Sequence, residues 1–282
     1  MDLHNLLVFQ DLFNDDVFRD IEKTISRENL NKGAVAAKLI NKAEQLGLSG
    51  NIIRSYMIYT VAHQSNCVSY AVEKSGGKIG KSLYQAFCHD IELIEKLLLL
   101  KPSLLLDCDL LDDYEPTNIN QSTAFNLLVE NLDKAQTSKD KADVFINYYR
   151  IFGSGDMADY RAFRWDRDED SLVGIKHFET MKLQDLIGYE YQKQELLANT
   201  KAFVVDKPAN NVLLVGARGT GKSSGVKAVV NSFFDKGLRL VQLTKEQLID
   251  LPVIMEERQL DEAVIVVVPR SKVFTRPSQL GF

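Results

Sequence analysis

Apolar residues recur every three or four positions along most of the first half of the chain, which is the pattern of helices that bury one face. In residues 3–21, LHNLLVFQDLFNDDVFRDI, the pattern predicts one helical stripe made of Leu6, Phe9, Phe13, Val17 and Ile21. Residues 82–100 repeat it with Leu83, Phe87, Ile91, Ile94 and Leu98. Residues 51–64 and 141–152 are also predicted to be helical. Residues 1–152 are therefore predicted to form an all-α N-terminal domain.

Helix ends are predicted most clearly around residues 32–46, KGAVAAKLINKAEQL. Asn31 precedes this segment and can cap its N-terminus, and Gly47 follows it as a stop. The apolar stripes fit a buried helical core. Where a stripe is not buried within the domain, it would instead bind an unknown protein partner.

Residues 153–184 show neither a helical nor a strand period and are predicted to be a connector. The segment GSGDMADYRAFRWDRDEDSLVG is rich in glycine, aspartate and arginine. Its tryptophan, Trp165, is expected to tether it by packing. The charged run 166–170 is expected to be a solvated turn rather than a metal site.

Residues 185–282 change to an alternation of strand-like and helix-like segments. NVLLV at 211–215, LRLVQL at 238–243 and AVIVVV at 263–268 are short apolar runs typical of buried strands. Residues 221–237 and 245–260 between them are predicted to be mainly helical. This alternation predicts an α/β domain with a parallel sheet.

The segment 211–225, NVLLVGARGTGKSSG, has the P-loop spacing Gly-x4-Gly-Lys-Ser, with a predicted strand before it and a predicted helix after it. Its glycines allow a close backbone approach, so that successive N–H groups at a helix N-terminus can hold phosphates. Lys222 is the expected cation for the β- and γ-phosphates, and the Ser223 hydroxyl is the expected Mg²⁺ ligand. The predicted phosphate-binding residues are Gly216, Ala217, Arg218, Gly219, Thr220, Gly221, Lys222, Ser223 and Ser224. The alternative is a glycine-rich turn that happens to carry Lys-Ser.

A second segment, SGGKIGKS at 75–82, has the same Gly-Lys-Ser ending. Ser75 stands where the first glycine of a P-loop is required, and a helical segment rather than an apolar strand precedes it. We therefore predict a glycine-rich link between two helices, with a second phosphate site as the alternative.

Composition narrows the function classes without deciding among them. The chain has 282 residues, of which 45% are hydrophobic and 26% charged, and a formal net charge of −5. This balance does not indicate nucleic acid or an anionic membrane as a partner. Cys67, Cys88 and Cys108 share no metal-binding spacing, although His63 and His89 lie near them in the sequence. Free thiols of this kind suit a reducing compartment, so we expect a cytoplasmic protein.

The stretch from 163 to 252, which includes LQDLIGYEYQK and the P-loop, is similar to a bacterial family of ATP-binding proteins of AAA+ type that carries a domain-of-unknown-function label. That family has a long helical N-terminal half. The resemblance implies a P-loop NTPase fold, Mg²⁺-dependent ATP hydrolysis in full-length members, and ring-like homo-oligomers. It also implies adenine contacts at Leu186, Ile187 and Gly188.

The same resemblance exposes a departure from the family pattern. An AAA+ ATPase ends its third strand with an acidic pair, whereas this chain has Val268, Pro269 and Arg270 there. Asp261 and Glu262 precede the strand and would lie roughly 20 Å from the phosphates at ~3.3 Å per residue. The family's next strand, sensor residue, arginine finger and lid have no counterpart, so the chain resembles a C-terminally truncated or frame-disrupted member. Without that strand, residues 211–215 and 263–268 would either pair directly or leave sheet edges open.

We therefore expect a protein that binds ATP and Mg²⁺ without hydrolysing ATP, and we assign no catalytic residue. Two functions stay open: an ATPase of AAA+ type that has lost its hydrolytic half, and a nucleotide-dependent switch or scaffold acting through the helical domain. A P-loop kinase or transferase is a third class, but that class does not require the LIGYEYQK segment.

Overall fold

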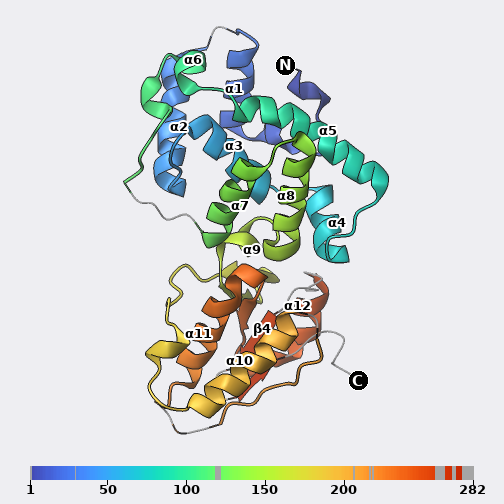
Figure 1. Ribbon diagram of the computed structural model, residues 1–282, viewed down its shortest axis with the longest axis vertical. Coiled ribbons are helices and arrows are strands. Elements are labelled where there is room, and N and C mark those ends of the chain that lie inside the picture. The colour runs from blue at the N-terminus through green and yellow to red at the C-terminus, as the bar shows by residue number, and fades with distance from the viewer. Residues whose placement is uncertain are drawn as a thin grey trace. The chain divides into compact units, whose positions relative to one another are not determined.

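The computed structural model describes residues 2–28, 30–117, 122–205, 207–215, 217, 219–257, 264–268 and 271–274 of the 282-residue chain. The chain divides into two compact units (Figure 1). The helical unit comprises Met1–Val72 and Gly77–Ala158, and the α/β unit comprises Glu73–Gly76 and Asp159–Phe282. An α/β fold with a helical part, as predicted, is thereby confirmed.

The helical unit is organised around α3 (Ile52–His63), in which Ile53, Met57, Ile58 and Val61 are fully buried. This helix packs against α2 (Lys32–Leu46), α5 (Lys81–Leu98) and α8 (Ser138–Phe152). The unit also contains α1 (Asp16–Ile25), α6 (Pro102–Leu106) and α7 (Thr123–Lys134), and parts of α4 (Cys67–Ser75) and α9 (Asp156–Asp159). Among the described residues, no helix has the length and apolarity needed to span a bilayer.

The residues predicted to begin and end α2 do so in the structure. The Asn31 side chain accepts a hydrogen bond from the Ala34 N–H at the start of α2, and Gly47 ends that helix with φ 68°. Residues 76–80 link α4 to α5, which confirms the glycine-rich connection between two helices.

The single helix predicted over residues 3–21 is wrong. The segment forms two 3-10 turns, Leu3–Asn5 and Gln10–Asn14, followed by α1. The Asp15 carboxylate accepts a hydrogen bond from the Phe18 N–H at 2.7 Å, so it caps α1 and starts a new helix there. The stripe positions Leu6, Phe9, Val17 and Ile21 are nevertheless buried.

The α/β unit contains a five-stranded mixed sheet in the order β2-β1-β3-β4-β5. Its strands are β1 (Ala162–Asp166), β2 (Ser171–Gly174), β3 (Arg239–Gln242), β4 (Val264–Val268) and β5 (Ser271–Phe274). The inner strands β1, β3 and β4 are parallel, with Ala162 opposite Leu240 and Leu240 opposite Ile265. The outer strands β2 and β5 pair antiparallel to them.

Two long helices pack together and contribute to the core of this unit. They are α10 (Glu190–Val204) and α11 (Lys222–Phe233), and a third helix, α12 (Leu251–Glu257), follows β3 (Figure 1). The core joins Leu196 and Phe203 of α10 and Val229 of α11 to Ala162 and Leu240 of the sheet.

The predicted connector at 153–184 is corrected by the structure, because β1 and β2 lie inside it. The boundary between the units falls at Ala158 and Asp159 rather than near residues 152 and 185. Residues 167–170 of the charged run form the exposed turn between these strands, whereas Asp166 is the last residue of β1. Trp165 is buried in β1, and its carbonyl accepts a hydrogen bond from Gln247 Nε2 at 3.1 Å.

The strand predicted at 211–215 is wrong, because these residues belong to none of the described strands. Direct pairing with residues 264–268 is not seen there either, because β4 has β3 on one side and β5 on the other. The side chains of Val212 and Leu214 pack on the core, whereas those of Leu213 and Val215 are exposed. The segment is thus apolar on both sides but buried on only one.

Candidate functional site

The glycine loop, here residues Ala217 and 219–222, leads directly into α11. Gly219 has φ 85° and Gly221 has φ 75°, values that disfavour any residue with a Cβ atom. Lys222 is the first residue of α11, with Gly221 as its N-cap. The N-terminus of α11, with its partial positive charge, therefore lies at the end of the loop, where it attracts an anion.

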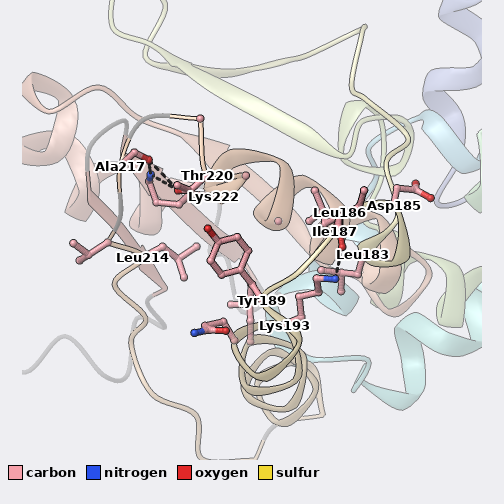
Figure 2. A pocket seen from close by; sticks show the side chains of 16 residues that line it. Leu183, Asp185, Leu186, Ile187, Tyr189, Lys193, Leu214, Ala217, Thr220 and Lys222 are labelled. Atoms are coloured by element: carbon pink, nitrogen blue, oxygen red, sulfur yellow. Dashed lines mark hydrogen bonds between the residues drawn. The ribbon is translucent and has the colours of Figure 1, made fainter.

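The lysine of the loop is held by the loop's own oxygen atoms. Lys222 Nζ donates to the Ala217 carbonyl oxygen at 2.6 Å and to Thr220 Oγ1 at 3.1 Å. Thr220 Oγ1 in turn donates to the Ala217 carbonyl at 2.9 Å (Figure 2). The ammonium group is thus kept at the loop by hydrogen bonds to neutral acceptors, which an anionic ligand can replace.

Residues Glu179–Ile187, here called the strap, are fastened to the side of α11. Asn231 Nδ2 donates to the carbonyl oxygens of Glu179 at 2.7 Å and Met181 at 2.9 Å. Lys227 Nζ lies 2.7 Å from Glu179 Oε1. These contacts fix the first part of the strap, and its other end lies at the glycine loop.

The end of the strap lies over the first turn of α11. A Cβ atom built on Gly221 or Gly225 would meet the methyl carbons of Leu186 at 3.8 and 3.9 Å. The Leu186 carbonyl accepts a hydrogen bond from Lys193 Nζ, which also bonds Glu190 Oε1 at 2.8 Å. Lys193 therefore joins the strap to α10.

These elements line an open pocket of about 830 Å³ (Figure 2). The glycine loop contributes one wall and Leu214 and Val215 lie beside it. The strap contributes Leu183, Asp185, Leu186 and Ile187. The third wall consists of Tyr189, the N-cap of α10, and of Gln192, Lys193 and Leu196 within α10. The volume suits a small organic ligand.

Tyr189 has an unusual backbone. It follows Gly188, whose φ is 80°, and itself has φ 59° as the residue that precedes α10. A left-handed conformation at a residue with a Cβ atom costs about 1 kcal/mol or more. Figure 2 shows its ring projecting into the pocket, between the glycine loop and the Leu186–Ile187 end of the strap.

The structure brings together most of the residues predicted from the sequence. Seven of them line this pocket: Leu186, Ile187, Ala217, Gly219, Thr220, Gly221 and Lys222. Gly188, Ser223 and Ser224 are not among the lining residues, although the two serines belong to the first turn of α11. Gly216 and Arg218 lie outside the described residues.

Sequence reasoning missed the α10 wall of the pocket. Its helical lining residues Gln192, Lys193 and Leu196 are one, three and four positions apart, which is the spacing of one helix face. The sequence already contains this spacing, but the spacing alone does not distinguish the wall of a pocket from a buried helix face. Lys193, which ties the strap to α10, carries no motif of its own.

Of the positions that matter for hydrolysis at and before the end of the third predicted strand, the structure describes only one. Val268 is the last residue of β4, whereas Asp261, Glu262, Pro269 and Arg270 lie outside the described residues. Among the described lining residues, Asp185 carries the one carboxylate, and its Oδ2 accepts the Lys182 N–H at 2.8 Å. Within the described part of the chain, no group of three or more His, Cys, Asp or Glu could hold a metal ion.

Residues 158–269 match the model of a protein family of unknown function, DUF815. The chain is similar to that family over a stretch that begins at the boundary of the α/β unit and contains the entire described pocket lining. No curated protein and no solved structure matches the chain. The expected domain-of-unknown-function label is thus confirmed, and the AAA+ resemblance stays a proposal.

Proposed function

We propose that the α/β unit binds ATP with Mg²⁺ in the pocket between the glycine loop and the strap, as a P-loop protein of AAA+ type. One observation carries this proposal. Lys222 stands at the start of α11 and lines the same pocket as the apolar side chains of Leu186 and Ile187. A cation with helix N–H groups suits a phosphate chain, and an apolar wall suits a base.

The residues fit a nucleotide in size and chemistry. The pocket volume of about 830 Å³ is within the range of sites for small cofactors. In this proposal the N–H groups of the glycine loop and Lys222 hold the phosphates, and the Ser223 hydroxyl together with phosphate oxygens binds Mg²⁺. The strap covers the base through Leu186 and Ile187.

Binding without hydrolysis is the second part of the proposal. Activation of an attacking water needs a carboxylate beside the phosphates, and Val268 stands at the end of β4. Asp185 lines the pocket, but its carboxylate already caps the Lys182 N–H on the strap. Residues 211–215 also depart from the P-loop pattern, because no described strand includes them.

The experiment is a titration with a fluorescent ATP analogue together with an assay of phosphate release. We expect saturable binding, no turnover, and a loss of affinity of about tenfold or more in Lys222→Ala. The matched control is Lys236→Ala, which removes the same charge at an exposed position outside the pocket. Unchanged binding in Lys222→Ala would refute the site. Phosphate release abolished by the same substitution would refute the absence of hydrolysis.

A nucleotide-dependent switch or scaffold acting through the helical unit is the second candidate. Leu99, Leu104 and Leu110 are exposed, each by more than 60% of its surface, near the end of α5, in α6 and in the following 3-10 turn. Exposed leucines on adjoining elements suit a protein partner. If ATP controls that surface, hydrogen exchange at residues 99–111 changes when ATP is added; identical exchange with and without ATP would contradict this function.

A further inference from the structure

The side chains of the pocket wall at α10 differ in role: some hold the structure together, and others are available to a ligand. Four residues, here called the pocket face of α10, line the pocket: Tyr189, which is the N-cap of α10, and Gln192, Lys193 and Leu196 within the helix. Leu196 is buried in the core of the unit, and Lys193 is bonded to Leu186 and Glu190. These two side chains have structural roles, so the ligand is left with Tyr189 and Gln192.

Gln192 offers an uncommitted amide to the pocket. Its side chain is exposed, and within the described part of the chain it makes no hydrogen bond. An amide carries a donor and an acceptor side by side, so it can bond two adjacent groups of a ligand at once. Its neighbours along the pocket face are an aromatic ring and an aliphatic side chain, which are surfaces for a flat apolar group.

Tyr189 offers the flat surface. Its side chain is 59% exposed although it lines the pocket, and its backbone is held at φ 59°. A strained conformation at an exposed aromatic residue is not explained by core packing, because the ring is not buried. In this conformation the ring projects between the glycine loop and the strap (Figure 2).

We propose that Tyr189 stacks on the nucleobase and that Gln192 reads the N6 and N7 edge of adenine. This inference rests on the proposed nucleotide binding and adds its base selectivity. Stacking on an aromatic ring tolerates any base. The amide provides the choice, because adenine presents a donor beside an acceptor on that edge, whereas guanine presents two acceptors.

The test compares ATP, GTP, 7-deaza-ATP and inorganic tripolyphosphate by calorimetric titration of the full chain. We expect the unmodified protein to bind ATP about 5- to 150-fold more tightly than GTP, and more tightly than 7-deaza-ATP, which lacks the N7 acceptor. Gln192→Leu should weaken ATP to the level of GTP. Tyr189→Leu should weaken ATP and GTP alike, by about 5- to 150-fold, and leave tripolyphosphate unchanged.

Two control variants separate the ring from its surroundings. Tyr189→Phe keeps the ring and should keep the affinity for ATP. Tyr191→Ala removes a neighbouring tyrosine that is 70% exposed and is not among the lining residues, so it should change nothing. Because Tyr189 and Gln192 are both exposed, their replacement leaves the core of the unit intact, which circular dichroism can verify.

The outcomes distinguish this inference from the function on which it rests. Tight binding of ATP with equal binding of GTP and 7-deaza-ATP would overturn the reading of adenine by Gln192 and leave nucleotide binding standing. Unchanged ATP affinity in Tyr189→Leu would overturn the stacking. Binding of tripolyphosphate without any preference for ATP would overturn both base contacts, and no binding of either would refute the proposed function itself.

Discussion

Leu186 lies against Gly225, with its Cδ1 atom 3.9 Å from the place that a Cβ atom on Gly225 would occupy. Its other methyl group lies 3.8 Å from the corresponding position on Gly221. Both separations are ordinary van der Waals contacts, so the space beside Leu186 admits a methyl group at either glycine. The two positions differ in backbone, because Gly221 has φ 75° and Gly225 lies inside α11.

This difference predicts opposite effects of the same substitution. Gly225→Ala should stabilise the α/β unit by about 0.5–1 kcal/mol, because alanine favours a helix interior over glycine. Gly221→Ala should destabilise it by about 1 kcal/mol or more, because alanine disfavours the left-handed region. Urea unfolding followed by the fluorescence of Trp165, the one tryptophan of the chain, measures both. Shifts of equal sign would contradict the prediction.

A buried carboxylate anchors the N-terminal segment in the helical unit. Asp90 is fully buried, and its Oδ2 accepts the N–H groups of Leu7, Val8 and Phe9 at 2.9, 2.7 and 3.1 Å. Asp90→Asn should cost about 1–3 kcal/mol, since the amide is uncharged and its NH2 group replaces one of the two oxygens that accept these bonds. Hydrogen exchange at residues 7–9 should accelerate. Asp113→Asn is the exposed control, and equal exchange in both variants would contradict the anchor.

The contact of Glu95 with α8 predicts a dependence on pH. Hydrogen bonds from Lys141, first, and from Ser138 hold the pKa of Glu95 below its ordinary value of 4.5. A carboxyl whose pKa is lower in the folded state stabilises it above the unfolded pKa, and this contribution is lost as the pH falls through the folded value. Glu95→Gln should therefore cost about 1 kcal/mol at pH 7, and the difference from the unmodified protein should shrink below pH 4.5.

Glu92, on the same helix as Glu95, provides the control for the Glu95–Lys141 ion pair. Glu92→Gln removes an exposed carboxylate that makes no ion pair with any described residue, and it should be nearly neutral at both pH values. Chemical denaturation at several pH values, followed by circular dichroism, compares the two variants. A Glu95→Gln cost that stays constant down to pH 3 would rule out the ion pair as its cause.

Gly174, at the end of β2 in the β1–β2 hairpin, packs closely against the ring of Tyr160. A Cβ atom there would lie 2.3 Å from Tyr160 Cδ2, which is a severe overlap with an aromatic ring. Gly174→Ala should destabilise the α/β unit by about 1–3 kcal/mol. Adding Tyr160→Ala removes the ring, so the methyl group should cost much less in that background. Equal costs in the two backgrounds, by Trp165 fluorescence, would show that Gly174 and Tyr160 are not in contact.

Features with a local cause could be predicted from the sequence. The Asn31 cap, the Gly47 stop and the start of α11 after Gly221 each depend on residues within one helical turn. The glycine loop and the strap were placed at one site by motif spacing and by resemblance, and they line one pocket.

Features with a distant cause could not be predicted in this way. The strand β1 is short and carries Arg164 and Asp166, and its pairing partners β2 and β3 fix it as a strand. The strain at Tyr189 has no sequence signal, because a tyrosine after a glycine occurs in many conformations. The segment 211–215 is apolar enough for a central strand, but strand pairing depends on an available sheet edge elsewhere in the chain.

The last prediction separates the strand expected at 211–215 from the segment that the structure describes. In a strand buried on both faces, Leu213 and Leu214 would be equally sensitive to a polar substitution. In the structure Leu214 packs on the core and Leu213 is 61% exposed. Leu214→Asn should therefore cost about 2 kcal/mol, and Leu213→Asn should stay within about 0.5 kcal/mol of the unmodified protein. Because the two substitutions are chemically identical and adjacent, their difference measures burial alone; equal costs by urea unfolding would favour the doubly buried strand.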